Sequence, residues 1–361
     1  MKNRDYFFSL EFANRLLAAK TVAAIESLLA DIDPVDPAAY TWNQRDPGNG
    51  WQPGRLHWIP VGRDRGNAGR IQLAGEPHNP PAERLVNGME AIIELMRRRE
   101  LLADPDAPMP RSPREAVERY FRMPRLDAIP AIDDKEWRRA IEARMPAIRQ
   151  QLAVRLDFDK KQKEFTLEIR DRGIGQTPSR VHETLLSLGQ TDKAEKPYLI
   201  GVFGQGGSST FFSSRYSIVV SRRAPECLDG DPDGVAWSII KKISPKGRRD
   251  PYYAYLAARH DGGVPAIDSP LFDFDYGVLF RHIAYDFGRG GSAVARTMYY
   301  ALNHVLFNPV LPYDLYALKT KPDAMHGNAY RLARRTAQLE RKQIPGVLDK
   351  AFQPQTIGDM R

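Results

Sequence analysis

Glu83-Arg-Leu-Val-Asn87-Gly-Met-Glu90-Ala91 decides the expected fold, and it lies in a helix predicted from about residue 81 to residue 102. Glu83, Asn87 and Glu90 are four and three residues apart, so they project from one face of that helix. An amide oxygen can ligate a hard cation such as Mg²⁺, and a carboxylate one turn away can orient and deprotonate a water. The stretch indicates metal-assisted hydrolysis; the alternative is an ordinary polar face of an amphipathic helix.

A second motif, Asp171-Arg-Gly173-Ile174-Gly175, directly follows a predicted strand at 164–170, which we expect to pair with another at 152–158. A carboxylate at a strand end can accept a hydrogen bond from an exocyclic amine. The two glycines let the backbone turn sharply and approach a planar base. A plain Asp-x-Gly turn is the alternative interpretation.

The third motif is glycine-rich and occupies residues 201–209, Gly-Val-Phe-Gly-Gln-Gly-Gly-Ser-Ser. Its backbone N–H groups can converge on phosphate oxygens, and a helix beginning at Ser208 would add a favourable dipole for anions. A flexible surface loop is the alternative. The motif lacks the Gly-Lys-Ser/Thr of a Walker loop and does not fit the Rossmann fingerprint.

In this order the three motifs resemble the N, G1 and G2 boxes of the GHKL ATPases, the superfamily of gyrase, heat-shock chaperones, histidine kinases and MutL. The segment 186–193 resembles the lid that precedes the last box, and the likeness covers roughly residues 76–290. Bacterial MORC-like or chaperone-like ATPases of defence or DNA-processing systems are the nearest analogy. The resemblance implies an α+β fold of the Bergerat type, a two-layer sandwich whose mixed, mostly antiparallel sheet is covered on one face by helices.

The same resemblance implies roles for matched positions. Glu83 would activate the attacking water, Asn87 would hold Mg²⁺, and Asp171 would accept from the adenine amine. Gly173, Ile174 and Gly175 would lie beside the base. The other residues expected to bind the nucleotide are Glu90, Lys193, Gly201, Val202, Phe203, Gly204, Gln205, Gly206, Gly207 and Ser208.

Three features depart from the family pattern. Residues from about 103 to 150 are expected to form an insertion. A valine, Val278, stands where a threonine is usual in a late strand, and Lys319 and Lys321 are the candidates for a lysine that contacts the γ-phosphate.

The expected organisation has three parts. Residues 1–75 contribute N-terminal helices (within 5–32) and short strands at 56–60 and 70–73. Residues 76–290 form the ATP-binding domain, with further strands at 217–221, 234–241 and 277–285. Residues 291–361 contribute a closing helix at 292–306 and then a basic linker or the start of a transducer domain.

Composition excludes several classes of protein. The 361 residues are 42% hydrophobic, and no apolar run is long enough to span a bilayer, so we expect a cytoplasmic protein without a membrane partner. Cys227 is the only cysteine, which rules out a disulfide within the chain and any CxxC metal site. The net charge of +8 favours a nucleic-acid partner; a charge spread over the solvated surface is the alternative.

The favoured function is Mg²⁺-dependent ATP binding and hydrolysis that drives lid closure and dimerisation, as a homodimer or with a partner subunit. An ATP-sensing or nucleic-acid-binding module with little turnover is the alternative. A histidine kinase ranks lower, because the helices expected within 5–32 contain no histidine to receive a phosphoryl group.

Overall fold

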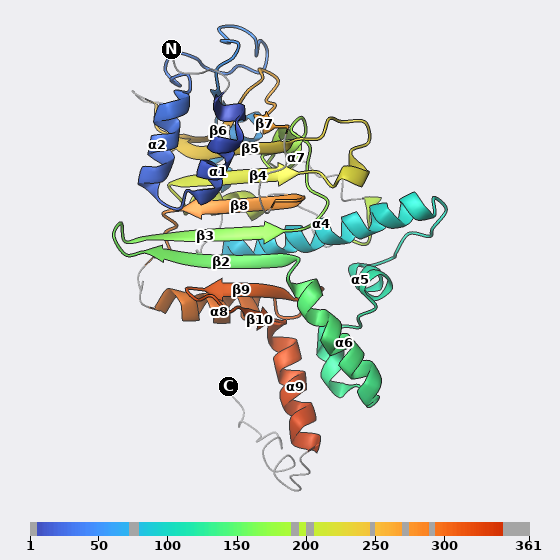
Figure 1. The fold of residues 1–361 in the computed structure, drawn as a ribbon. Coiled ribbons are helices and arrows are strands. Elements are labelled where there is room, and N and C mark those ends of the chain that lie inside the picture. The colour runs from blue at the N-terminus through green and yellow to red at the C-terminus, as the bar shows by residue number, and fades with distance from the viewer. Residues whose placement is uncertain are drawn as a thin grey trace, which may run out of the picture.

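The computed structural model describes residues 6–71, 79–188, 195–199, 206–245, 250–268, 274–288 and 293–341. They form an α+β fold with a large, mostly antiparallel mixed sheet and helices packed on it (Figure 1). Lys193 and residues 201–205 of the glycine-rich motif lie outside the described residues. Within the described part of the chain, no helix combines the length and apolar character needed to cross a bilayer.

The sheet has the strand order β1-β6-β5-β4-β8-β3-β2-β9-β10, and β7 pairs with β5. β2 and β9 run parallel, whereas the other described pairs are antiparallel. The strands are β1 (His57–Pro60), β2 (Leu152–Asp159), β3 (Glu164–Asp171), β4 (Tyr216–Arg222), β5 (Val235–Ile243), β6 (Tyr252–Ala257), β7 (Ala266–Ile267), β8 (Gly277–Ile283), β9 (Tyr313–Ala317) and β10 (Asp323–Met325).

Helices connect and cover these strands. They are α1 (Leu10–Ala18), α2 (Val22–Ile32), α3 (Asn67–Ile71), α4 (Asn79–Ala103), α5 (Pro113–Phe121), α6 (Lys135–Arg149), α7 (Val181–Thr184), α8 (Val294–Val305) and α9 (Gly327–Arg341). Short 3-10 segments include η3 (Leu126–Ala131), η5 (Gly206–Phe211) and η6 (Pro225–Cys227).

The two faces of the sheet carry different helices. α4 packs against Ile169 of β3. Paired residues on neighbouring strands point to the same face of a sheet, so Phe280, which pairs with Ile169, and Val219 of β4, which pairs with Phe280, share the α4 face. Ile218, the neighbour of Val219, therefore faces the other side, where it packs with Phe12 of α1. The long α4 runs behind the central strands in Figure 1, while α1 and α2 lie in front of β4, β5 and β6. This differs from the expected coverage of one face only.

Most expected elements are present. Strands β2, β3, β4, β5 and β8 and helices α1, α2, α4 and α8 confirm the predicted ranges to within a few residues. The strand expected at 70–73 is wrong for its first two residues, which belong to α3. The buried Asn67 side chain explains this: it donates to the Val61 and Tyr253 carbonyls and accepts from the Tyr253 N–H, which anchors the start of that helix.

Two regions join the same core as α4. Residues of α5, η3 and α6, within the expected insertion, pack with Met89 and Ile93 of α4 through Val117, Leu126 and Ile141. Further along the chain, β9 and β10 extend the sheet beyond β2, and α9 packs against η3 and α8. The polar stretch after residue 319 thus continues the fold as far as residue 341.

Candidate functional site

A cavity of about 590 Å³ lies between α4 and the neighbouring ends of β3 and β8. Its volume falls within the range of about 300–1,000 Å³ that small-molecule sites occupy. From α4 it is lined by Arg84, Asn87, Gly88, Glu90, Ala91 and Glu94, and from the sheet by Ile169, Asp171, Val278 and Phe280. Residues of the loops that follow β3 and β4, among them Ile174, Thr177, Arg223 and Asp231, complete the wall.

Asp171 is a buried acid of this cavity. It ends β3, in register with Leu152 of β2 and Val278 of β8, and is only 8% exposed. Its Oδ1 accepts a hydrogen bond of 2.9 Å from the Gly173 N–H. Burial raises the pKa of Asp171 to about 7, although backbone hydrogen bonds from Gly173 and Val278 favour the ionised form. Near neutral pH this carboxyl group can therefore either accept or donate a proton.

The loop after Asp171 is clamped between α4 and β4. The Ile174 N–H donates to the Ala91 carbonyl at 2.9 Å, and a Cβ at Gly173 would lie 2.5 Å from the Ala91 Cβ. Gly175 has a φ of +63°, and a Cβ there would lie 1.9 Å from the Arg222 carbonyl oxygen. Both glycines are needed because no side chain fits at either place. They hold Ile174 against the cavity and fix Asp171 beside it.

α4 presents the three polar residues of the first motif differently. Asn87 is half-buried and Glu90 is 3% exposed, and both line the cavity. Glu83, one turn before Asn87, is exposed and does not belong to the lining. The structure thus brings Asn87, Glu90, Asp171 and Ile174 to one cavity and leaves the exposed Glu83 outside its lining.

The end of the glycine-rich motif lies beside α4. Gly206, Gly207 and Ser208 begin η5, a 3-10 helix that packs against α4. The side chain of Arg84 joins the two elements, because its Nε donates to Thr210 Oγ1 at 3.3 Å. The described end of this motif and the first motif are therefore neighbours in space.

Sequence reasoning missed several residues of the cavity. Glu94 accepts from Lys196 Nζ at 3.0 Å and from the Tyr198 hydroxyl at 2.8 Å, which ties α4 to residues 195–199. Its spacing of four from Glu90 places it on the same helix face, a signal that could have found it. The buried Arg84 was also missed. It shares a helix face with the small residues Gly88 and Ala91, and small residues on one face indicate that this face packs closely against the rest of the protein.

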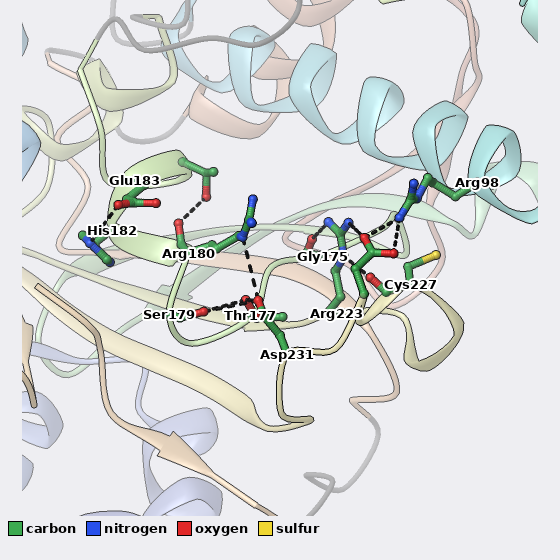
Figure 2. Close-up of polar contacts among 12 residues, drawn as sticks. Arg98, Gly175, Thr177, Ser179, Arg180, His182, Glu183, Arg223, Cys227 and Asp231 are labelled. Atoms are coloured by element: carbon green, nitrogen blue, oxygen red, sulfur yellow. Dashed lines mark hydrogen bonds and ion pairs between the residues drawn. The ribbon is translucent and has the colours of Figure 1, made fainter.

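Arginine side chains secure the rim of the cavity (Figure 2). Arg223 donates to the carbonyls of Gly175 at 3.1 Å and Cys227 at 2.9 Å, so it links the loop after β3 to η6. Thr177 Oγ1 donates to Asp231 Oδ2 at 2.7 Å on the same rim. Cys227 is buried, and burial raises the pKa of its thiol, which keeps it protonated. These contacts shape the site, and they leave Cys227 a poor nucleophile.

Among the described residues, no cluster of three or more histidine, cysteine or acidic side chains is arranged to hold a metal ion. The Asn87 amide oxygen is a hard ligand of the kind Mg²⁺ takes together with ligand oxygens. No protein-family model matches the chain, and a comparison with curated proteins gives no match either.

Proposed function

We propose that this chain is a Mg²⁺-dependent ATPase of the GHKL superfamily, in which α4 and the sheet form a Bergerat-type nucleotide-binding core and α1 and α2 are an addition on the opposite face of the sheet. One observation carries the proposal: Asn87 and Glu90 of the first motif and Asp171 of the second, far apart in sequence, line one cavity. The described end of the third motif, in η5, packs against α4 beside this cavity, so the arrangement suits one ligand that contacts all three motifs.

Adenine recognition is assigned to the end of β3. Asp171, when ionised, is a buried acceptor for the exocyclic amine of the base, and a buried acceptor of this kind discriminates strongly against a ligand that leaves it unpaired. Ile169, Ile174 and Val278 provide apolar walls for the faces of the ring. The role expected of a threonine in the late strand falls to Val278, which cannot hydrogen-bond the base.

Phosphate binding is assigned to the end of the cavity near Asn87 and η5. Mg²⁺, when bound, would neutralise phosphate charge and polarise the phosphoryl oxygens. The Asn87 amide oxygen would hold it, and Glu90 would support it. The backbone N–H groups of Gly206, Gly207 and Ser208 would face the phosphates, and Glu83 would orient the attacking water from its exposed position one turn away.

An ATP-sensing or nucleic-acid-binding module with little turnover is the second candidate. The position of Glu83 outside the cavity lining favours it, since a base there depends on the terminal phosphate reaching past Asn87. Action as a homodimer or with a partner subunit, a role in bacterial defence or DNA processing, and a cytoplasmic location belong to the proposal by analogy with the superfamily.

Phosphate release tests the ATPase directly. We expect wild type to release phosphate from ATP only with Mg²⁺. Glu83→Ala should lose about 10²–10⁴-fold of the rate and keep its ATP affinity. Glu142→Ala, an exposed glutamate of α6, is the matched control and should behave as wild type. Equal background release by wild type and Glu83→Ala would reject turnover in favour of the sensing module, and unchanged ATP binding by Asp171→Ala would reject the adenine pocket.

A further inference from the structure

Arg84 is a buried cation that faces the cavity, and no carboxylate of the described residues forms an ion pair with it. It is 6% exposed and lines the cavity from α4. Its Nη2 has no hydrogen-bond partner among the described residues. Several other buried atoms in the described part of the chain share that condition, but Arg84 alone among their residues belongs to the cavity lining.

Arg97 and Arg281, the two other deeply buried arginines that the structure describes, show how such a charge is accommodated elsewhere in the fold. Arg97 pairs with Glu100 and donates to the Ala107 carbonyl. Arg281 pairs with Glu168 and donates to the Ala19 carbonyl. Both are thus compensated by a carboxylate and by backbone oxygens, whereas the hydrogen bond of Arg84 is to the neutral hydroxyl of Thr210.

The remaining contacts of Arg84 are aromatic. Its guanidinium carbon lies 3.6 Å from the ring centroid of Phe280 and 5.0 Å from that of Phe211. Contacts of this type offset only part of the free-energy cost of removing an ion from water. Burial lowers the pKa of Arg84 to about 9, so the group is still a cation at pH 7. Within the described part of the chain, this positive charge therefore has no anionic partner.

The position of Arg84 relates it to both ends of the cavity. Gly88, one turn along α4, lies against Asp171, while Thr210 belongs to η5, which begins with the end of the glycine-rich motif. A ligand with a hydrogen-bond donor at the Asp171 end and an anionic group toward η5 would satisfy both buried residues. A nucleotide has this polarity.

We infer that Arg84 is the residue of this chain that receives the anionic phosphate chain of the bound nucleotide, from within the cavity. This rests on the proposed function for the identity of the nucleotide, but the requirement for an anion comes from Arg84 itself. The assignment supplies a cation from the first motif, so that binding of the phosphates does not depend on Lys319 or Lys321. Lys319 pairs with Asp323 after the end of β9, whereas Asp171 is in register with Leu152 at the opposite end of the neighbouring parallel strand β2.

A buried water offers a competing account of the unpartnered atom. The His282 ring is fully buried near Arg84, whose charge helps to lower the pKa of that histidine, and its Nε2 also lacks a partner among the described residues. A water joining the two side chains would satisfy them without any ligand. In that case Arg84 would serve the core, and its replacement would leave ligand affinity unchanged.

The test compares Arg84→Met with Arg97→Met, which removes a compensated buried arginine that does not line the cavity. Calorimetric titrations with adenosine, AMP, ADP, ATP and pyrophosphate measure affinity, and thermal melts measure stability. We expect Arg84→Met to melt no lower than wild type, to bind ADP and ATP about 10–100-fold more weakly, and to bind adenosine equally well. Arg97→Met should melt several degrees lower and keep its nucleotide affinities. Arg84→Lys keeps the positive charge but loses the paired N–H donors of the planar guanidinium group, so it should bind ADP with intermediate affinity.

The outcomes separate the inference from the proposed function. Equal affinity of wild type and Arg84→Met for ADP and pyrophosphate would overturn the inference, and ATP binding by wild type would still support the function. An equal loss for adenosine and ADP would place Arg84 on the base and likewise overturn it. In another outcome, wild type binds pyrophosphate but no adenine nucleotide, and pyrophosphate binding is lost in Arg84→Met. That result would support the anion site at Arg84 and reject the proposed function. Wild type that binds none of the five compounds would reject both.

Discussion

Gly88 of α4 lies against Asp171 of β3 so closely that a Cβ at Gly88 would be 3.3 Å from the Asp171 Cβ. The same atom would be 2.7 Å from Cδ1 of Leu152. The approach lets the helix that carries Asn87 and Glu90 pass directly over the end of the strand that carries Asp171. The depth of the cavity at its acidic end is thus set by the absence of one side chain.

Replacing Gly88 with alanine tests this relationship. Alanine gains about 1 kcal/mol in a helix interior, but overpacking against Asp171 and Leu152 costs about 1–3 kcal/mol. We expect a net loss of up to about 2 kcal/mol in the free energy of unfolding, together with weaker ATP binding because the carboxylate is displaced. Gly69→Ala is the matched control: a Cβ at Gly69 in α3 meets nothing within 4 Å, so that variant should gain stability and bind normally. A Gly88→Ala variant that matches Gly69→Ala in urea denaturation and in ATP titration would contradict the close approach.

The raised pKa of Asp171 predicts that nucleotide binding releases a proton. The pKa of about 7 in the free protein means that much of the carboxyl group is protonated at pH 6.5. Donation from an exocyclic amine favours the carboxylate and lowers this pKa, so ATP affinity should rise by up to about tenfold from pH 6 to pH 8. Calorimetry in buffers of different ionisation enthalpy measures the released proton. Asp171→Asn should show weak binding without this pH dependence, and an unchanged pH profile in that variant would assign the proton to another group.

Asn87 predicts a separate dependence on Mg²⁺. Removing Mg²⁺ should weaken ATP binding by wild type, whereas Asp171→Ala should abolish binding with or without the ion. Asn87→Ala removes the amide oxygen, so its ATP affinity should match that of metal-free wild type and respond little to added Mg²⁺. ATP titrations with and without EDTA measure this. A full Mg²⁺ response in Asn87→Ala would mean that the ion is held elsewhere.

Local patterns in the sequence were enough to predict the elements that carry Asn87 and Asp171. The helical spacing of apolar residues around Asn87 and the alternation before Asp171 both depend on short stretches of chain, and each matches an observed element. β6, with the sequence Tyr-Tyr-Ala-Tyr-Leu-Ala, was not predicted, although its aromatic residues favour a strand. It lies between β5 and β1 and is buried on both faces, so it shows no alternation to detect.

The features that the sequence did not predict depend on contacts between distant segments. The parallel pairing of β9 with β2 joins residues from opposite ends of the core, and no local pattern reveals it. Arg84 reads in isolation as one more polar residue of an amphipathic helix. Its burial follows from how closely α4 lies on Phe280 and Phe211, which only the folded chain shows.

Acid stability offers a last prediction, because buried histidines and Asp171 act in opposite directions. Burial lowers the pKa values of His57 and His326 to about 4, so both are neutral in the folded protein. Between pH 6.5 and pH 4 the unfolded chain binds protons at these rings and the folded chain does not, so stability falls as the pH falls. Each ring contributes up to about 3 kcal/mol of this loss. Asp171 behaves oppositely: its folded pKa of about 7 exceeds the unfolded value of 3.8, so its contribution to stability rises as the pH falls from 7 to 4.

Urea denaturation at pH 7 and pH 4.5 separates these contributions. His326→Gln should lose less stability than wild type on acidification, because glutamine binds no proton. Asp171→Asn should lose more, because it lacks the compensating carboxyl group, and at pH 7 it should be more stable than wild type since no buried carboxylate is present. His304→Gln, at an exposed position of α8, is the control for replacing a histidine outside the core. If both variants lose less stability than wild type on acidification, or both lose more, then either His326 is not neutral or Asp171 is not protonated in the folded protein at pH 4.5.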